Sequence, residues 1–293
     1  MELLGRQLAG GLAAGALYGL MALGLVLIYK ASEVVNFGHG DMAAFSTFIA
    51  FTLWVLWEWP VPLALGGTLV LAALLGVVVE RGVLRLARQR HAPGLALVVA
   101  TLGVSQVLNG VIGAVWGRQV KSLPSLVVGP PLRLGEIVLT REQVFNLGLG
   151  LALAGALFIF FRFTDVGIAL RAVAQNPMAA QLMGVSVDHM LTVTWGLGAM
   201  LGAVAGVLIT PATFLEPDTM NAVLIRAFAA AVLGGVTSLP GAVVGGLVLG
   251  VLENLVAGYI ATELKTVFAF SLIVVVLAVR PAGLLGQVIA RKV

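Results

Sequence analysis

The chain has no cysteine among its 293 residues, and only 10% of its residues are charged. The absence of cysteine excludes disulfides, thiol catalysis and cysteine-ligated metal, so packing and lipid must hold the fold together. The three histidines, His39, His91 and His189, are scattered along the sequence, and we predict no metal site. The scarcity of charge accompanies 60% hydrophobic residues, well above the roughly 45–50% of soluble domains. The composition predicts a membrane protein.

Two further absences limit the function. No "GxxxxGK[ST]" sequence occurs, so we expect ATP to bind elsewhere than on this chain. No nucleophile, base and orienting group stand together, so we do not predict an enzyme. The net charge of +4 comes from basic residues in short clusters at the ends of apolar segments. That placement indicates membrane topology rather than nucleic-acid binding.

Long apolar segments are what the sequence has in abundance. A membrane span needs about 20 apolar residues. We therefore predict an all-α, polytopic helical membrane protein with about eight transmembrane helices, eight or nine, forming one domain over 1–293. The segments are 8–28, 40–57, 62–79, 95–116, 144–161, 192–211, 225–258 and 267–279.

Two of these segments allow more than one interpretation. The 225–258 segment is too long for one ordinary helix and contains "SLPG" at Ser238–Gly241, so it is either one broken helix or two short ones. The 40–57 segment begins within a polar stretch and is either a full span or a re-entrant half-helix. The first segment is followed by Lys30 rather than by a cleavage site, which favours a retained span.

The basic residues predict the orientation. The stretch 80–91 carries Arg81, Arg85, Arg88 and Arg90 directly after a span, which places it in the cytoplasm. The loop 117–143 also has four basic residues, but they are spread over more than twice that length. Two spans later, the region 162–191 returns to the cytoplasm. The side of the N-terminus stays open because 40–57 is ambiguous.

Many of the 37 glycines recur at four-residue spacing. Such spacing replaces side chains with hydrogen along one stripe of a helix and lets helix backbones approach closely. We predict glycine-rich helix packing. The clearest series are Gly11, Gly15 and Gly19; Gly198, Gly202 and Gly206; and Gly241 and Gly245.

The stretch "VVNFGHGDMAAF", residues 34–45, gathers polar groups between apolar segments. Its glycines permit an irregular backbone, Asn36 can cap the next helix, and Asp41 falls in that helix's first turn, where a carboxylate is favourable. We interpret it as a buried break near a path through the membrane, because polar and ionisable groups at this depth often mark such paths. His39 has two interpretations, a structural histidine at a helix start or a substrate contact.

A second polar feature lies within the uncharged segment 95–116. Four-residue spacing puts Thr101, Ser105 and Asn109 on one helical face, with Gln106 beside them. That face should point away from lipid, toward either neighbouring helices or substrate. Together with Asn36, His39 and Asp41, these four residues form our candidate translocation path. Glu253 and Asn254 could likewise contact either neighbouring helices or substrate, and for these two residues we favour a structural role.

The region 162–191 interrupts the hydrophobic pattern. Asn176 precedes Pro177, as a cap before a first-turn proline, and "MAAQLM" ends at Gly184, a helix stop. We predict a short amphipathic helix. It is either a helix that docks into a groove on a partner or part of a plain connecting loop.

The stretch "MAAQLMG" at 178–184 resembles the EAA loop of ABC importer permeases, whose pattern is Glu-Ala-Ala, three residues, then Gly. Ala179, Ala180 and Gly184 match it, whereas Met178 stands at the glutamate position. Three other stretches resemble the permeases of branched-chain amino-acid importers, the LivH and LivM type. They are "NFGHGDM" at 36–42, "RAFAAAVLGGVTSLPGAVVGGLVLGVLEN" at 226–254 and "RPAGLLG" at 280–286.

The resemblance implies a permease subunit of a prokaryotic plasma (inner) membrane ABC importer for branched-chain, hydrophobic amino acids. The partners that it implies are a second permease (a homologue or a second copy of this chain), two cytoplasmic ATP-binding subunits, a soluble substrate-binding protein and the lipid bilayer. It implies that ATP and Mg bind to the partner subunits and that this chain binds no cofactor. The coupling residues within 162–191 would be Arg171, Asn176, Pro177, Met178, Ala179, Ala180, Leu182 and Gly184.

Two alternatives stay open on the sequence. Similar permeases serve urea, amides or other small solutes, and the binding protein largely sets that choice. A proton-coupled secondary transporter would instead use His39, Asp41 and Glu253 as a relay.

Overall fold

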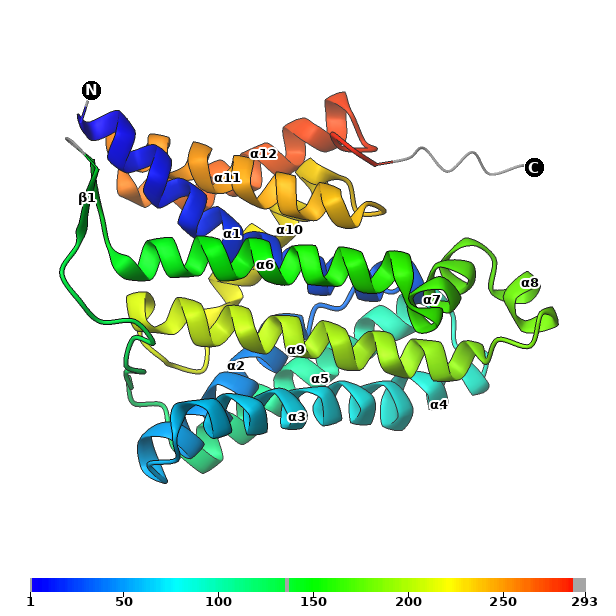
Figure 1. Ribbon diagram of the computed structural model, residues 1–293. Coiled ribbons are helices and arrows are strands. Elements are labelled where there is room, and N and C mark those ends of the chain that lie inside the picture. The colour runs from blue at the N-terminus through cyan, green and yellow to red at the C-terminus, as the bar shows by residue number, and fades with distance from the viewer. Residues whose placement is uncertain (1, 135–136, 287–293) are drawn as a thin grey trace. The chain divides into compact units, whose positions relative to one another are not determined.

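The computed structural model describes residues 2–134 and 137–286, which are mostly helical (Figure 1). A short antiparallel hairpin pairs β1 (Leu132–Leu134) with β2 (Ile137–Leu139). The helices are α1 Glu2–Ser32, α2 His39–Phe51, η1 Thr52–Leu56, α3 Val61–Val79, η2 Glu80–Leu84, α4 Arg85–Gln89, α5 Gly94–Trp116, α6 Arg141–Phe163, α7 Asp165–Gln175, α8 Pro177–Leu182, α9 Val187–Thr213, α10 Thr219–Gly234, α11 Leu239–Tyr259, η3 Thr262–Leu264 and α12 Lys265–Val279.

The prediction of an all-α polytopic membrane protein is confirmed. Within the described residues, 8 helical stretches are long and apolar enough to cross a membrane, α2 with η1 among them. The apolar segment 225–258 is two helices, α10 and α11. Their break falls at Gly235, whose φ of +107° suits glycine, and Ser238 caps α11 by accepting a hydrogen bond from the Gly241 N–H.

The chain forms two compact units. Unit 1 comprises Met1–Val26, Ser125–Gly155 and Leu224–Val293, and unit 2 comprises Leu27–Pro124 and Ala156–Val223. Both are assembled from segments that are far apart in the sequence, so each unit depends on contacts between distant parts of the chain. We describe each by itself.

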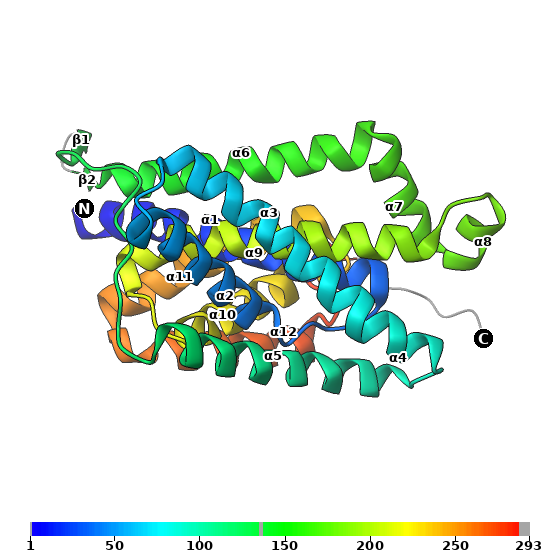
Figure 2. The same cartoon turned by 90° about the horizontal axis from the view of Figure 1, so that it is seen from below.

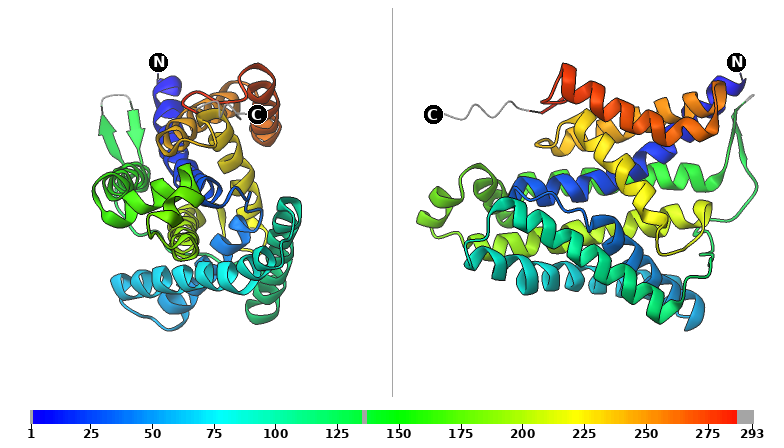
Figure 3. Two further views of the ribbon diagram at one scale, coloured as in Figure 1. Left: turned by 90° about the vertical axis from the view of Figure 1, so that its right-hand side faces the viewer. Right: turned by 180° about the vertical axis from the view of Figure 1, so that it is seen from behind.

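In unit 1, the predicted glycine packing joins α1 to α11 (Figure 3). A Cβ atom on Gly250 would lie 2.4 Å from the backbone of both Gly11 and Gly15, and one on Gly15 would lie 2.6 Å from the Gly246 carbonyl oxygen. These distances leave no room for a side chain. In a lipid bilayer the hydrophobic effect does not drive helices together, because lipid tails are as apolar as the side chains. Close backbone contact of this kind therefore stabilises the helix pair through van der Waals packing.

The segment 280–286 closes over the break between α10 and α11 in the same unit. The N–H of Leu284 donates to the Leu233 carbonyl at 2.8 Å, and that of Leu285 to the Gly234 carbonyl at 2.9 Å. Gly283, at φ +73°, lies against Gly235. The end of α10 thereby gains hydrogen-bond partners for carbonyls that a helix terminus leaves unpaired.

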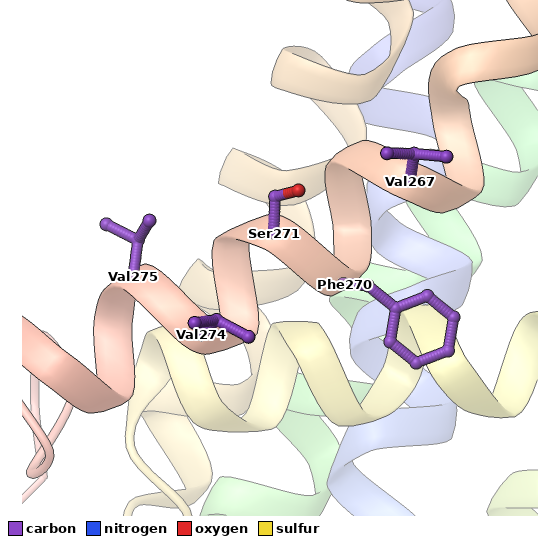
Figure 4. A pocket seen from close by; sticks show the side chains of 5 residues that line it. All are labelled: Val267, Phe270, Ser271, Val274 and Val275. Atoms are coloured by element: carbon purple, nitrogen blue, oxygen red, sulfur yellow. The ribbon is translucent and has the colours of Figure 1, made fainter.

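Helix α12 carries an exposed apolar face. Figure 4 shows Val267, Phe270, Val274 and Val275 along it, with Ser271 among them. The four apolar side chains are at least half exposed. Such a face suits lipid contact, because a membrane helix can leave apolar side chains outward without cost.

In unit 2, α3 and α9 lie side by side, and α2 packs against α9 (Figures 1 and 2). A Cβ on Gly76 of α3 would be 2.3 Å from the Trp195 carbonyl oxygen of α9. Gly206 of α9 meets Thr47 of α2. The buried cluster between these helices includes Ile28, Met42, Val79, Leu84, Leu97, Leu108, Trp195 and Ala199.

We expect Gly250→Ala to lower the free energy of unfolding in detergent by about 1–3 kcal/mol, because the added methyl group must displace the α1 backbone. Gly155→Ala is the matched control, since a Cβ there meets nothing within 4 Å. That change should leave thermal unfolding unchanged or raise it slightly through helix propensity. Equal effects of the two substitutions would contradict the packing argument.

Candidate functional site

The polar stretch around the start of α2 lies about half-way along the helices of unit 2. The Ser105 hydroxyl, at the middle of α5, donates to the Asp41 carboxylate, and Gly202, at the middle of α9, lies beside His39. At the other end of α2, the Trp116 indole N–H donates to Thr52 Oγ1 at 2.8 Å, and Trp116 is the last residue of α5. Helix α2 therefore begins at mid-height and runs to the end of α5.

The backbone of residues 33–38 is not helical, yet its polar groups find partners. The Phe37 N–H donates to Thr101 Oγ1 at 3.1 Å, and the Gly38 N–H donates to Asn36 Oδ1 at 3.0 Å. Asn36 is only 1% exposed. Irregular backbone at membrane depth is tolerated only where it is buried in protein or lines a water-filled cavity. The predicted buried break is present here.

The prediction that Asn36 caps α2 is wrong. The N-cap residue is Gly38, and no side chain caps this helix. Asn36 stands two residues earlier, so its side-chain Oδ1 accepts the Gly38 N–H and closes the preceding turn, while its Nδ2 donates to Met42 Sδ at 3.5 Å. Asp41 lies in the first turn of α2, as predicted.

Three of the four polar residues predicted on α5 follow one face. Thr101 and Ser105 are buried and contact the α2 region. One turn further, Asn109 donates to Asp218 Oδ1 at 2.9 Å and accepts from Arg118 Nη2 at 3.3 Å. Gln106 lies on the exposed side of α5 and does not join this row.

Sequence reasoning missed Arg118 and Asp218, which extend the row beyond Asn109. Asp218 lies in the short connection between α9 and α10, and no spacing within α5 points to it. His39 is fully buried, and a Cβ on Gly202 would be 3.2 Å from its Cε1. Among the described residues, no group of three or more His, Asp or Glu is arranged to hold a metal ion.

Unit 1 holds a buried ion pair of its own. Arg226 Nε of α10 donates to Glu253 Oε1 of α11 at 2.6 Å, and their side chains are 16% and 3% exposed. The guanidinium carbon of Arg226 also lies 5.8 Å from the centre of the Tyr18 ring. Because the pair joins two neighbouring helices, it supports the structural interpretation of Glu253.

The predicted short helix of region 162–191 is α8. Asn176 Oδ1 accepts the Ala179 N–H at 3.0 Å, Pro177 is in the first turn, and Gly184 follows the helix with φ +86°. Helix α7, which Thr164 caps, precedes α8 directly and was not predicted as a separate helix.

Helix α8 lies at one end of unit 2 (Figure 1). Its apolar side chains are largely exposed. Met178, Leu182 and Met183 are 72–84% exposed, whereas Ala180 is buried. Arg171 on α7 is exposed as well. An exposed apolar surface next to charged groups is typical of a protein-binding helix.

Contacts within unit 2 agree with the predicted orientation. Arg85 Nη2 donates to the Asp188 carbonyl at 2.8 Å, so the stretch 80–91 and the start of α9 lie at the same end. At the opposite end, Lys121 and Leu215 form an isolated β-bridge between the loops that follow α5 and α9. The two loops predicted to be cytoplasmic therefore share one side of this unit.

Comparison with known proteins supplies further findings. Residues 7–277 match the family described as branched-chain amino acid transport system / permease component. The chain is 32% identical to the high-affinity branched-chain amino acid transport system permease protein LivH of Escherichia coli K12, covering 98% of this chain and 97% of that protein. It is 30% identical to BraD of Pseudomonas aeruginosa, with the same coverage.

More distant similarities concern the fold and the wider group. The xylose transport system permease protein XylH of Escherichia coli K12 is 25% identical, covering 82% of this chain and 75% of that protein. A solved structure of PsaBC from Streptococcus pneumoniae in complex with Fab has a TM-score of 0.52 at 14% identity, covering 96% of this chain and 93% of that one. This last likeness shows the fold alone.

We expect Arg226→Leu to lower the free energy of unfolding by about 3–5 kcal/mol, because it leaves the Glu253 carboxylate buried without its cation. The double variant Arg226→Met with Glu253→Leu should recover most of that loss, since it removes both charges and retains apolar volume. Thermal unfolding in detergent measures both. A double variant as unstable as the single one would show that the pair itself is not the cause.

Proposed function

The chain belongs to the branched-chain amino acid transport permease family, and on that basis we propose that it is the membrane permease subunit of an ABC importer for branched-chain aliphatic amino acids. The main observation in support is the match to LivH and BraD proteins over nearly the full length of this chain and of each relative. It is a multi-pass transport protein rather than an enzyme. ATP hydrolysis belongs to separate ATPase subunits.

The assembly follows from this role. We place the chain in a prokaryotic inner membrane with a second permease subunit, which is a homologue or a second copy. Two cytoplasmic ATPases would bind ATP and Mg, and a soluble binding protein would deliver the solute. Each partner can shift the permease between inward-open and outward-open states only through its different affinity for the two states.

The segment α7–α8 is proposed to dock on the ATPase. Its outward Met178, Leu182 and Met183 offer an apolar contact, and Arg171 and Asn176 flank it. Pro177 and Gly184 set the start and end of the helix, while Ala179 and buried Ala180 permit close approach to its neighbours. With methionine at the glutamate position of the EAA pattern, this contact relies on apolar burial rather than charge.

The translocation path is proposed to pass the start of α2. There Asp41 is bonded to Ser105, the Phe37 N–H next to Asn36 is bonded to Thr101, and His39 lies beside Gly202 at mid-height of unit 2. Asn109 continues the polar row toward the end of α5 where Trp116 lies. Polar groups buried at this depth are costly and mark solute pathways in membrane proteins. The exposed position of Gln106 favours a contact with lipid or a partner instead.

The coupling role is tested by reconstituting the chain with its ATPases and permease partner and measuring uptake of radiolabelled leucine delivered by the binding protein. Leu182→Asp should abolish ATPase association and ATP-driven uptake, because it places a charge in an apolar contact. His91→Asp adds the same charge in an exposed turn after α4 and should leave uptake unchanged. Uptake that continues without ATP and collapses with a protonophore would instead indicate a secondary transporter.

The path is tested by Ser105→Ala against Gln106→Ala. We expect the first to slow leucine uptake by roughly 10- to 150-fold, since losing a hydrogen bond to a buried carboxyl group costs about 1.5–3 kcal/mol. The second, on the exposed side of the same helix turn, should leave the rate unchanged. Rates are normalised to assembled complex. A slow Gln106→Ala with a normal Ser105→Ala would reverse the assignment of the path face.

A further inference from the structure

Glu80 is a fully buried carboxylate that the proposed path does not use. It opens η2, a π-helical turn inside the long helix that runs from α3 to α4. Both carboxylate oxygens are occupied. Oε1 accepts from Arg88 Nη2, and Oε2 accepts from the Thr192 hydroxyl of α9 at 2.7 Å. Single π-helical turns within α-helices occur frequently at functional sites.

Arg85 provides a second connection to α9. Its Nη2 donates to the Asp188 carbonyl at 2.8 Å and to Thr192 Oγ1 at 3.2 Å. The same atom lies 3.8 Å from Glu80 Oε2, and Arg85 Nε lies 3.8 Å from Asp188 Oδ2. Thr192 thus accepts from Arg85 and donates to Glu80. We call Glu80, Arg85, Arg88, Asp188 and Thr192 the Glu80 cluster.

The Glu80 cluster lies where α9 leaves the coupling segment. Only a short connection separates α8 from α9, and Ser186 caps α9 there by accepting the His189 N–H. A displacement of α8 therefore reaches the first turns of α9, which hold Asp188 and Thr192. Through the cluster, those turns are bonded to η2 at the end of α3.

Beyond the cluster, α3 and α9 pack with their backbones in contact. Gly76 lies against the Trp195 carbonyl, and a Cβ there would be 3.0 Å from Ala199 Cβ. A Cβ on Gly196 would be 3.5 Å from the Ala73 carbonyl oxygen. A closely packed interface of this kind has few alternative arrangements. We therefore expect α3 and α9 to move together when the Glu80 cluster joins their ends.

We propose that Glu80 is a positioning residue that fastens the start of α9 to η2, so that α3 and α9 move as one body when the ATPase displaces α7–α8. This inference rests on the proposed function, because it needs the coupling segment to dock on an ATPase. A network that both sites can bias is the physical requirement for coupling between them.

The first test removes one hydroxyl. Thr192→Val is nearly isosteric and deletes the bonds to Glu80 and Arg85. Thr194→Val is the matched control, since the buried Thr194 hydroxyl bonds to the Met190 carbonyl of its own helix just as Thr192 bonds to the Asp188 carbonyl, and within the described residues it bonds to no other helix. In the reconstituted complex, we expect leucine moved per ATP hydrolysed to fall roughly 2- to 30-fold for Thr192→Val and to stay unchanged for the control.

The second test asks whether a disulfide between α3 and α9 can replace the contacts of the Glu80 cluster. The chain has no cysteine, so Ala73→Cys with Gly196→Cys introduces a single pair. An ideal Cβ at Gly196 lies 4.0 Å from Ala73 Cβ, within disulfide range. Oxidation with copper phenanthroline should leave coupling normal in the otherwise native chain and restore it in the Thr192→Val chain. Dithiothreitol should remove the restoration, which a role in folding alone would not produce.

Provided that uptake by the native complex is driven by ATP, any of three results would overturn the inference. The first is unchanged coupling in Thr192→Val, and the second is a disulfide that blocks transport in the otherwise native chain. The third is a disulfide that fails to restore coupling in Thr192→Val. The second would show that α3 and α9 slide past each other. A native complex without ATP-driven uptake would overturn the proposed function and this inference together, and is recognised in the native control before any variant is compared.

Discussion

The structure of unit 2 depends on one constraint, that backbone inside a membrane must have hydrogen-bond partners even where it is not helical. The Thr101 hydroxyl meets this need for the Phe37 N–H, and Asn36 meets it for the Gly38 N–H. With those donors satisfied, the chain can leave α1, cross to mid-height without helical structure, and begin α2 there. The polar groups around Asp41 owe their depth to this arrangement.

Small residues make the same arrangement sterically feasible. Gly202 and Gly206 allow α2 to lie against α9, and Gly76 allows α3 to approach α9 from another side. Helix α9 is therefore a shared support for the helix that carries the polar break and for the helix that carries Glu80. In this way the region next to the proposed path and the region next to the proposed docking segment are built on one element.

Local patterns in the sequence predicted a large part of the fold. The apolar segments, the α10–α11 break, the glycine contacts and the cap of α8 each depend on neighbouring residues or on composition. Two errors are local: Asn36 closes a turn with Gly38 rather than capping α2, and helical rotation turns Gln106 away from the face of Ser105. The residues that were missed are distant in sequence, since Asp218 and Thr192 reach α5 and η2 from other parts of the chain. No local period encodes such pairings.

The contact between α1 and α11 has a consequence for biosynthesis. Gly11 and Gly15 face Gly246 and Gly250, so α1 must wait for α11, which is synthesised much later, before its glycine surface is covered. The α10–α11 break is likewise completed only when 280–286 follows. Unit 1 therefore matures only after residues 280–286 have been translated, and until α11 is in place α1 exposes a glycine surface that the insertion machinery or lipid must shield.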